Sequence, residues 1–172
     1  MPNWCENQLF VRGKKADVAA FMEFARSGRD DDGAGSVLDF NKIAPYPDEF
    51  SLADAARRKW NDENEGVEWD KRPPQPKDGY NAGGYEWCVK NWGTKWPASD
   101  PDVYVTSRGC TYTFNTAWGP PGPVVIKASE LFPELTFKLK YWEGGQGFKG
   151  ELTAKAGQHE EWDGDYSGDR GG

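Results

Sequence analysis

The sequence predicts an α+β domain in which helices cover one face of an antiparallel sheet. The prediction depends mainly on residues 111–156, where the hydrophobic period changes from two to about 3.6 and back again. Apolar and polar residues alternate from Thr111 to Trp118, which is typical of a half-buried strand. After the Gly-Pro-Pro-Gly turn at 119–122, apolar residues follow at helical spacing up to Phe132. Two further alternating segments complete the stretch.

The chain before this stretch adds a strand, a helix and a second strand, and then an insertion. Asn7–Arg12 has the alternation of a first strand, and residues 16–26 carry an apolar stripe at helical spacing. The apolar residues between Val37 and Ile43 predict the second strand. After the insertion, residues 110–117 predict either a single strand or, with residues 103–107, a hairpin that turns at Arg108-Gly109.

Residues 44–101 do not follow this pattern and are interpreted as an insertion. They hold a helix signal over residues 48–60, a proline-rich exposed loop over 61–79 and a short helix over 84–92. Residues 158–172 are acidic and rich in glycine, and they predict a disordered tail. Residues 1–157 are therefore expected to form one domain.

Without the insertion, the order of elements is βαββαβ plus one further strand. That order is the split βαβ or ferredoxin-like arrangement, an antiparallel sheet with helices on one face. The sequence thus places the helical and loop insertion, about residues 44–101, between the second and third core strands.

Composition limits the functional class. The chain has 172 residues and a formal charge of −7, which argues against a general nucleic-acid binder because phosphate contacts need clustered Lys and Arg. Aromatic residues make up 15% of the chain and include nine Trp, so many rings must be buried or form a binding surface. No segment approaches membrane-spanning length, and we expect a cytoplasmic protein that does not bind membranes.

The sequence contains no catalytic signature. Its single histidine, His159, lies in the predicted tail, so acid–base chemistry would depend on carboxylates such as Glu86, Asp100 or Glu143. Cys5, Cys88 and Cys110 lack the spacing of a zinc site or a disulfide framework and are expected to be buried free thiols. We therefore expect no metal and no cofactor, and a binding protein rather than an enzyme.

The most informative polar and aromatic residues lie at strand ends and in the connections that lead into the sheet. Trp and Asn together can stack a flat ligand and bind its edge, or form the centre of a protein interface. The alternative is that these residues only pack the insertion against the sheet. We expect one binding surface to be lined by Trp4, Asn7, Trp92, Trp96 and Trp118.

Strand alternation predicts a second surface. If the apolar residues of the last two strands face the helices, four lysines and Trp142 point to the open face of the sheet. Sheets of this kind that bind RNA use this face, so nucleic-acid binding stays an alternative. The lysines are Lys138, Lys140, Lys149 and Lys155.

Three separated motifs resemble the YubB-like family of small plasmid and phage proteins with a ferredoxin-like domain. They are the opening MPNWCEN, the central EWCVKNWGTKW and the run FNTAWGPPGPVVIKASELFPELTFKLKYWE, followed by FKGE. No motif covers residues 29–36 or 61–82. The resemblance implies the ferredoxin-like fold and a mobile-element origin, and it implies no activity.

The sequence therefore predicts a non-enzymatic binding protein of a phage or plasmid. We expect it to act in the bacterial cytoplasm on a host protein or a small ligand, modulating host physiology or a defence system. An enzyme of unfamiliar type that uses carboxylates stays an alternative, and no oligomeric state is fixed.

Overall fold

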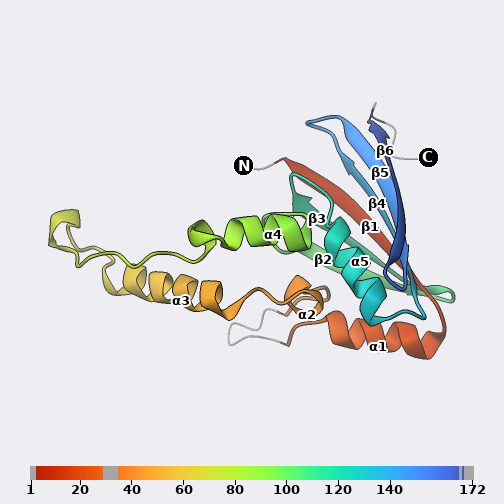
Figure 1. Ribbon diagram of the computed structural model, residues 1–172, viewed down its shortest axis with the longest axis horizontal. Coiled ribbons are helices and arrows are strands. Elements are labelled where there is room, and N and C mark those ends of the chain that lie inside the picture. The colour runs from red at the N-terminus through yellow and green to blue at the C-terminus, as the bar shows by residue number, and fades with distance from the viewer. Residues whose placement is uncertain (1–2, 29–34, 167, 169–172) are drawn as a thin grey trace.

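The computed structural model describes residues 3–28, 35–166 and 168. Its six strands form one antiparallel sheet in the order β2-β3-β1-β4-β5-β6 (Figure 1). The strands are β1 (Trp4–Arg12), β2 (Ser99–Thr106), β3 (Gly109–Ala117), β4 (Thr136–Glu143), β5 (Phe148–Lys155) and β6 (Gln158–Asp165). The helices are α1 (Lys15–Ala25), α2 (Phe40–Ile43), α3 (Asp48–Glu63), α4 (Gly84–Trp92) and α5 (Gly122–Leu131), with short 3₁₀ turns at Trp69–Lys71 and Tyr80–Ala82.

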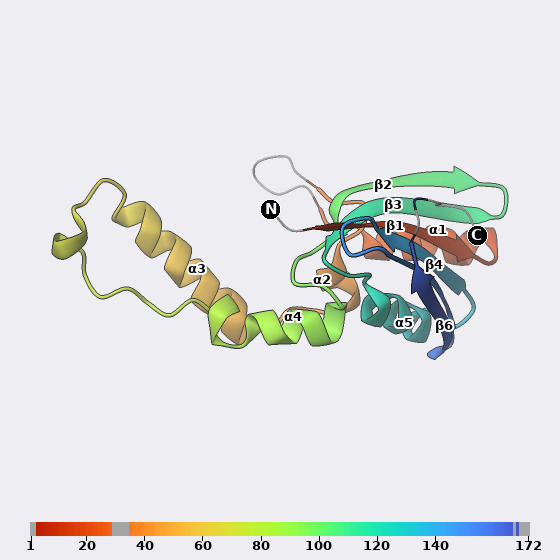
Figure 2. The same ribbon diagram turned by 90° about the horizontal axis from the view of Figure 1, so that it is seen from above.

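The ferredoxin-like prediction is confirmed. The elements β1, α1, β2, β3, α5 and β4 follow the βαββαβ order, and their strands lie in the spatial order β2-β3-β1-β4. Helices α1, α2, α4 and α5 lie on one side of the sheet and leave its other face open (Figures 1 and 2). Strands β5 and β6 extend the sheet beyond β4, so there are two added strands where one was expected.

The predicted second strand at residues 37–43 is wrong. Phe40–Ile43 is the short helix α2, whose first turn is capped because the Asp39 carboxylate accepts the Asn41 N–H at 2.9 Å. Phe40 and Ile43 are buried on one side of that turn, at helical spacing. The second core strand is β2, so the insertion lies between α1 and β2, not between the second and third core strands.

The predicted disordered tail is wrong over residues 158–165. These residues form β6, which pairs with β5 along its whole length, from Phe148 opposite Asp165 to Lys155 opposite Gln158. The hairpin turns at Ala156 and Gly157, whose φ angles of 49° and 78° are those of a tight two-residue turn. Most of the remaining predicted tail lies outside the described residues.

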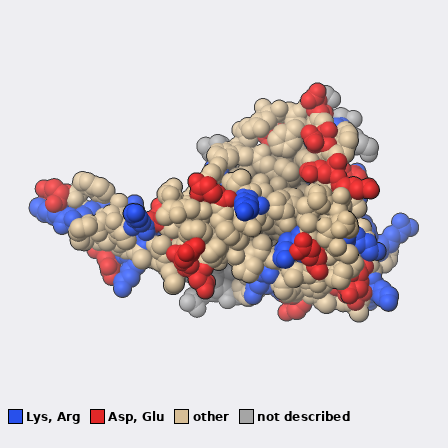
Figure 3. Space-filling model, viewed as in Figure 1, with Lys and Arg blue, Asp and Glu red and all other residues tan. Residues whose placement is uncertain are grey.

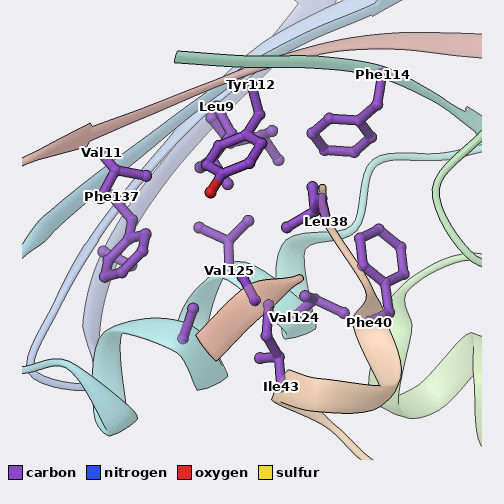
Figure 4. Packing of buried hydrophobic residues seen from close by; sticks show 14 of the residues in the cluster. Leu9, Val11, Leu38, Phe40, Ile43, Tyr112, Phe114, Val124, Val125 and Phe137 are labelled. Carbon is purple, nitrogen blue, oxygen red and sulfur yellow. The ribbon is translucent and has the colours of Figure 1, made fainter. Parts of the chain in front are cut away.

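One hydrophobic core joins the sheet, the two core helices and the insertion. In Figure 4, Tyr112 and Phe137 point from the sheet toward Val125 of α5, and Leu38 and Phe40 fill the neighbouring space. Phe40 meets Phe114 at a ring-centroid distance of 6.1 Å and near-perpendicular planes. The insertion is thus part of the core at its base.

Beyond that base, α3 and its return segment project away from the sheet (Figures 1 and 2). Hydrogen bonds from side chains to the backbone hold α3 and the return segment together. The Asp54 carboxylate accepts the Tyr80 N–H at 2.8 Å, and Arg57 donates to the Pro76 carbonyl at 2.7 Å. Within the described residues, no helix is long and apolar enough to cross a membrane.

The three cysteines are buried free thiols, as expected. Burial raises the pKa of Cys5 to about 12 and the pKa values of Cys88 and Cys110 to about 11. Because the thiolate is the reactive form, all three should be inert in the folded protein.

Shortening Phe40 should show that α2 belongs to the core. Phe40→Ala is expected to lower the free energy of unfolding by about 3–5 kcal/mol, because it removes a fully buried ring. The matched control is Leu52→Ala on the exposed surface of α3, expected to change it by less than about 0.5 kcal/mol. Urea unfolding measures both, and equal effects would contradict this packing.

Alkylation provides an independent test of burial. At pH 8, iodoacetamide should leave Cys5, Cys88 and Cys110 unmodified in the folded protein, because this pH lies far below their raised pKa values. Mass spectrometry after the same treatment in urea should show three modified thiols. Rapid modification of any one of them without denaturant would contradict its placement.

Candidate functional site

Three tryptophans gather at one end of the sheet, where β1 begins and β3 ends. Trp4 lies opposite Ala117 in the β1–β3 register, and Trp118 follows Ala117. Trp96 comes from the connection between α4 and β2, and its ring centroid lies 6.4 Å from that of Trp4. The three residues are 40%, 40% and 44% exposed in the order Trp4, Trp96, Trp118.

Lys95 lies between two of these rings. Its Nζ atom is 4.0 Å from the centroid of the Trp96 ring and 3.7 Å from that of Trp118. Each contact is a cation–π interaction, worth about 0.5–1 kcal/mol at an exposed site. We call Trp4, Lys95, Trp96 and Trp118 the tryptophan edge.

Backbone and hydroxyl hydrogen bonds tie the segments of the tryptophan edge together. The Trp118 N–H donates to the Asn3 carbonyl at 2.9 Å, which joins the start of β1 to the end of β3. The buried Thr94 hydroxyl donates to the Ala117 carbonyl at 2.9 Å. The Tyr80 hydroxyl, whose pKa is raised by burial, donates to the Lys95 carbonyl at 3.3 Å. The three segments are therefore fixed relative to one another.

Trp118 has an unusual backbone conformation. Its φ of 72° lies in the left-handed region, which bulky side chains rarely adopt. A buried polar chain supports the turn beneath it: Asn7 Nδ2 donates to Thr116 Oγ1 at 2.8 Å, and Thr116 Oγ1 donates to the Gly119 carbonyl at 2.7 Å. Such conformations persist where the surroundings enforce them, often at functional sites.

Gly93 allows the insertion to approach this turn. It ends α4 with a φ of 79°, and its N–H donates to the Val89 carbonyl at 3.1 Å. A Cβ atom at this position would lie 2.7 Å from the Pro120 carbonyl oxygen and from Pro123 Cδ. A glycine is therefore required both by the helix end and by the contact with the 119–122 turn.

The structure brings together three of the five predicted residues, namely Trp4, Trp96 and Trp118. Trp92 is only 3% exposed, and its indole N–H donates to the Ala44 carbonyl at 2.9 Å, so it anchors the insertion in the core. Asn7 is 2% exposed and supports the turn. The prediction that all five line one surface is therefore wrong for Asn7 and Trp92. Sequence reasoning missed Lys95, although it directly precedes Trp96.

The three candidate carboxylates occupy three different elements. Glu143 is buried, and its two oxygens accept the N–H groups of Gly145 and Gln146 at 2.7 and 2.5 Å, so it stabilises the β4–β5 turn. Asp100 lines an open-face groove of about 240 Å³ beside Gln8 and Asn115. Glu86 is exposed on α4. Among the described residues, no three His, Cys, Asp or Glu side chains are grouped to hold a metal ion.

The predicted lysine strip is interrupted by an acid. The Glu151 carboxylate forms ion pairs with Lys138 and Lys140, at N–O distances of 2.5 and 3.8 Å. Strand β6 then adds Glu160 to the same face, opposite Thr153. Lys149 lies opposite Trp142, while Lys155 is exposed at the end of β5. The open face therefore carries mixed charge, which gives little support to binding a polyanion.

The fold has known relatives. Residues 91–170 match the family model described as a ferredoxin-like domain in Api92-like protein. The matched segment includes Lys95, Trp96 and Trp118, while Trp4 lies outside it.

The whole chain is also similar to a solved structure, the crystal structure of a protein api92 from Yersinia pseudotuberculosis. The match has a TM-score of 0.59 at 12% sequence identity and covers 98% of this chain and 99% of that chain. No curated protein matches the chain. These similarities establish the fold alone.

The polar chain under Trp118 can be tested by one substitution. Thr116→Val removes one of the acceptors of Asn7 Nδ2 and the hydroxyl that donates to the Gly119 carbonyl, so we expect the free energy of unfolding to fall by about 1–3 kcal/mol. Thr111→Val on the open face of the same strand is the control, expected to have little effect. Equal urea midpoints for the two variants would contradict the supporting role.

Proposed function

We propose that this chain is a binding protein that recognises another protein through the tryptophan edge. The observation that carries the proposal is the half-exposure of three clustered indoles, two of which lie against Lys95, on segments fixed by hydrogen bonds. In the space-filling view, the surface over the start of β1 is mostly uncharged (Figure 3). An apolar centre with little charge is typical of the core of a protein interface.

Leaving these three indole rings partly exposed to water is unfavourable, and the fold does not require it. The same chain buries Trp92 almost completely, so its core can accommodate indole. Tryptophan is enriched among the residues that dominate binding energy, where its large rigid surface becomes covered by the partner. Clustered half-exposed indoles therefore favour a surface that is covered in a complex.

The rigidity of the tryptophan edge favours tight binding. The Asn7–Thr116–Gly119 chain, the Thr94 hydroxyl and the Trp118 N–H hold the ring-bearing segments before a partner arrives. A preorganised surface loses less conformational entropy on association. Most of the free energy gained when a partner buries the three rings can therefore contribute to affinity.

The biological setting of the proposal comes from the sequence. The resemblance to YubB-like proteins of plasmids and phages supports a partner in the cytoplasm of a bacterial host, with the chain acting on host or defence proteins.

Affinity capture from a bacterial lysate tests the proposal. Trp96→Ala and Trp118→Ala should each weaken capture of the partner by about 2–4 kcal/mol, which is the range of strong interface residues. Both residues are partly exposed, so neither change should unfold the chain.

The matched control is Trp69→Ala in the projecting insertion, a residue that is 71% exposed and lies outside the tryptophan edge. It should leave capture unchanged. Loss of capture in Trp69→Ala, with retention in Trp96→Ala and Trp118→Ala, would place the binding surface elsewhere and overturn the proposal.

A further inference from the structure

The position of Lys95 restricts what can cover the tryptophan edge. Its ammonium group lies over the Trp96 and Trp118 rings, at 4.0 and 3.7 Å. A partner that buries these two rings must therefore also bury Lys95 Nζ. This restriction rests on the proposed function, because it applies only if the edge is an interface.

The ammonium group of Lys95 lies against aromatic rings and is not paired with an acid in the described part of the chain. Among the described residues, no carboxylate forms an ion pair with it, whereas Lys127, Lys138 and Lys140 each have one. The aromatic faces stabilise part of the positive charge of the ammonium group, and its remaining N–H donors can bind water. The charge is therefore compatible with water in the free protein but not with a dry interface.

Removing the water around the Lys95 ammonium group is costly unless the partner supplies a counter-charge. Burying an ammonium group without a counter-charge costs several kcal/mol, and a carboxylate with good geometry compensates for much of that loss. We infer that the partner is a largely apolar protein segment that places one Asp or Glu carboxylate on Lys95 and apolar side chains on the surrounding indoles. The edge would then select a carboxylate within an apolar sequence.

A nucleic-acid phosphate is the competing anion. The chain's formal charge of −7 and the acids of β6 oppose a polyanion, whose affinity depends on many phosphate contacts. One lysine among three indoles is better matched to one carboxylate on an otherwise apolar segment. The protein segment is therefore favoured, and nucleic acid becomes an outcome of the test.

A random peptide library displayed on yeast provides the test, with the full-length chain as bait. Peptides that bind the wild-type chain should be enriched in Asp or Glu beside aliphatic or aromatic residues. Their affinity for Lys95→Met should be roughly 10- to 100-fold lower, because a charge-assisted contact is lost. Lys95→Glu should instead enrich peptides that carry Lys or Arg.

One control variant and three contrary outcomes complete the test. Lys90→Glu makes the same charge change on the exposed surface of α4 and should not alter the enriched sequences. Peptides that require Trp96 but carry no acid, or that bind Lys95→Met equally well, would overturn the inference and leave the proposed function standing. Failure to enrich any Trp96-dependent peptide would count against both. Lys95-dependent binding of an oligothymidylate would overturn the inference, because the anion on Lys95 would then be a nucleic-acid phosphate and not a carboxylate.

Discussion

The antiparallel register between β1 and β3 determines which residues are exposed and which support them. It places Trp4 opposite Ala117 and brings Asn3 beside Trp118, whose N–H it accepts. The same register puts Asn7 on the helix-covered face, within reach of Thr116. A slip of one residue would move every side chain of β1 to the other face, burying Trp4 and exposing Asn7. The exposed rings and the buried polar chain are thus consequences of one strand pairing.

The insertion supplies the other half of the tryptophan edge. Trp92 fixes α4 in the core, Gly93 ends that helix against the 119–122 turn, and Thr94 binds the end of β3. Lys95 and Trp96 follow immediately and reach the surface. Five consecutive residues therefore carry the chain from the core to the candidate interface. Changes in the packing of the insertion should thus be transmitted to the surface that we propose to bind.

Regular hydrophobic patterns were sufficient to predict most of the core. Strand alternation found β1, β3, β4 and β5, and helical spacing found α1, α4 and α5. The short run from Leu38 to Ile43 fits either period, and only the cap formed by Asp39 decides for a helix. Strand β6 shows no alternation because nearly all of its side chains are exposed. Lys95 could not be placed from sequence, because its two rings come from segments that meet only in the folded chain.

We propose that the tryptophan edge, and not another exposed indole, is covered by a partner. The most direct measurement is NMR of the chain labelled with ¹⁵N at its tryptophan indoles, recorded before and after addition of bacterial extract. The indole signals of Trp4, Trp96 and Trp118 should broaden, while those of Trp69 and Trp162, which are also exposed, should persist. Broadening of Trp69 or Trp162 with unchanged signals from the tryptophan edge would contradict this proposal.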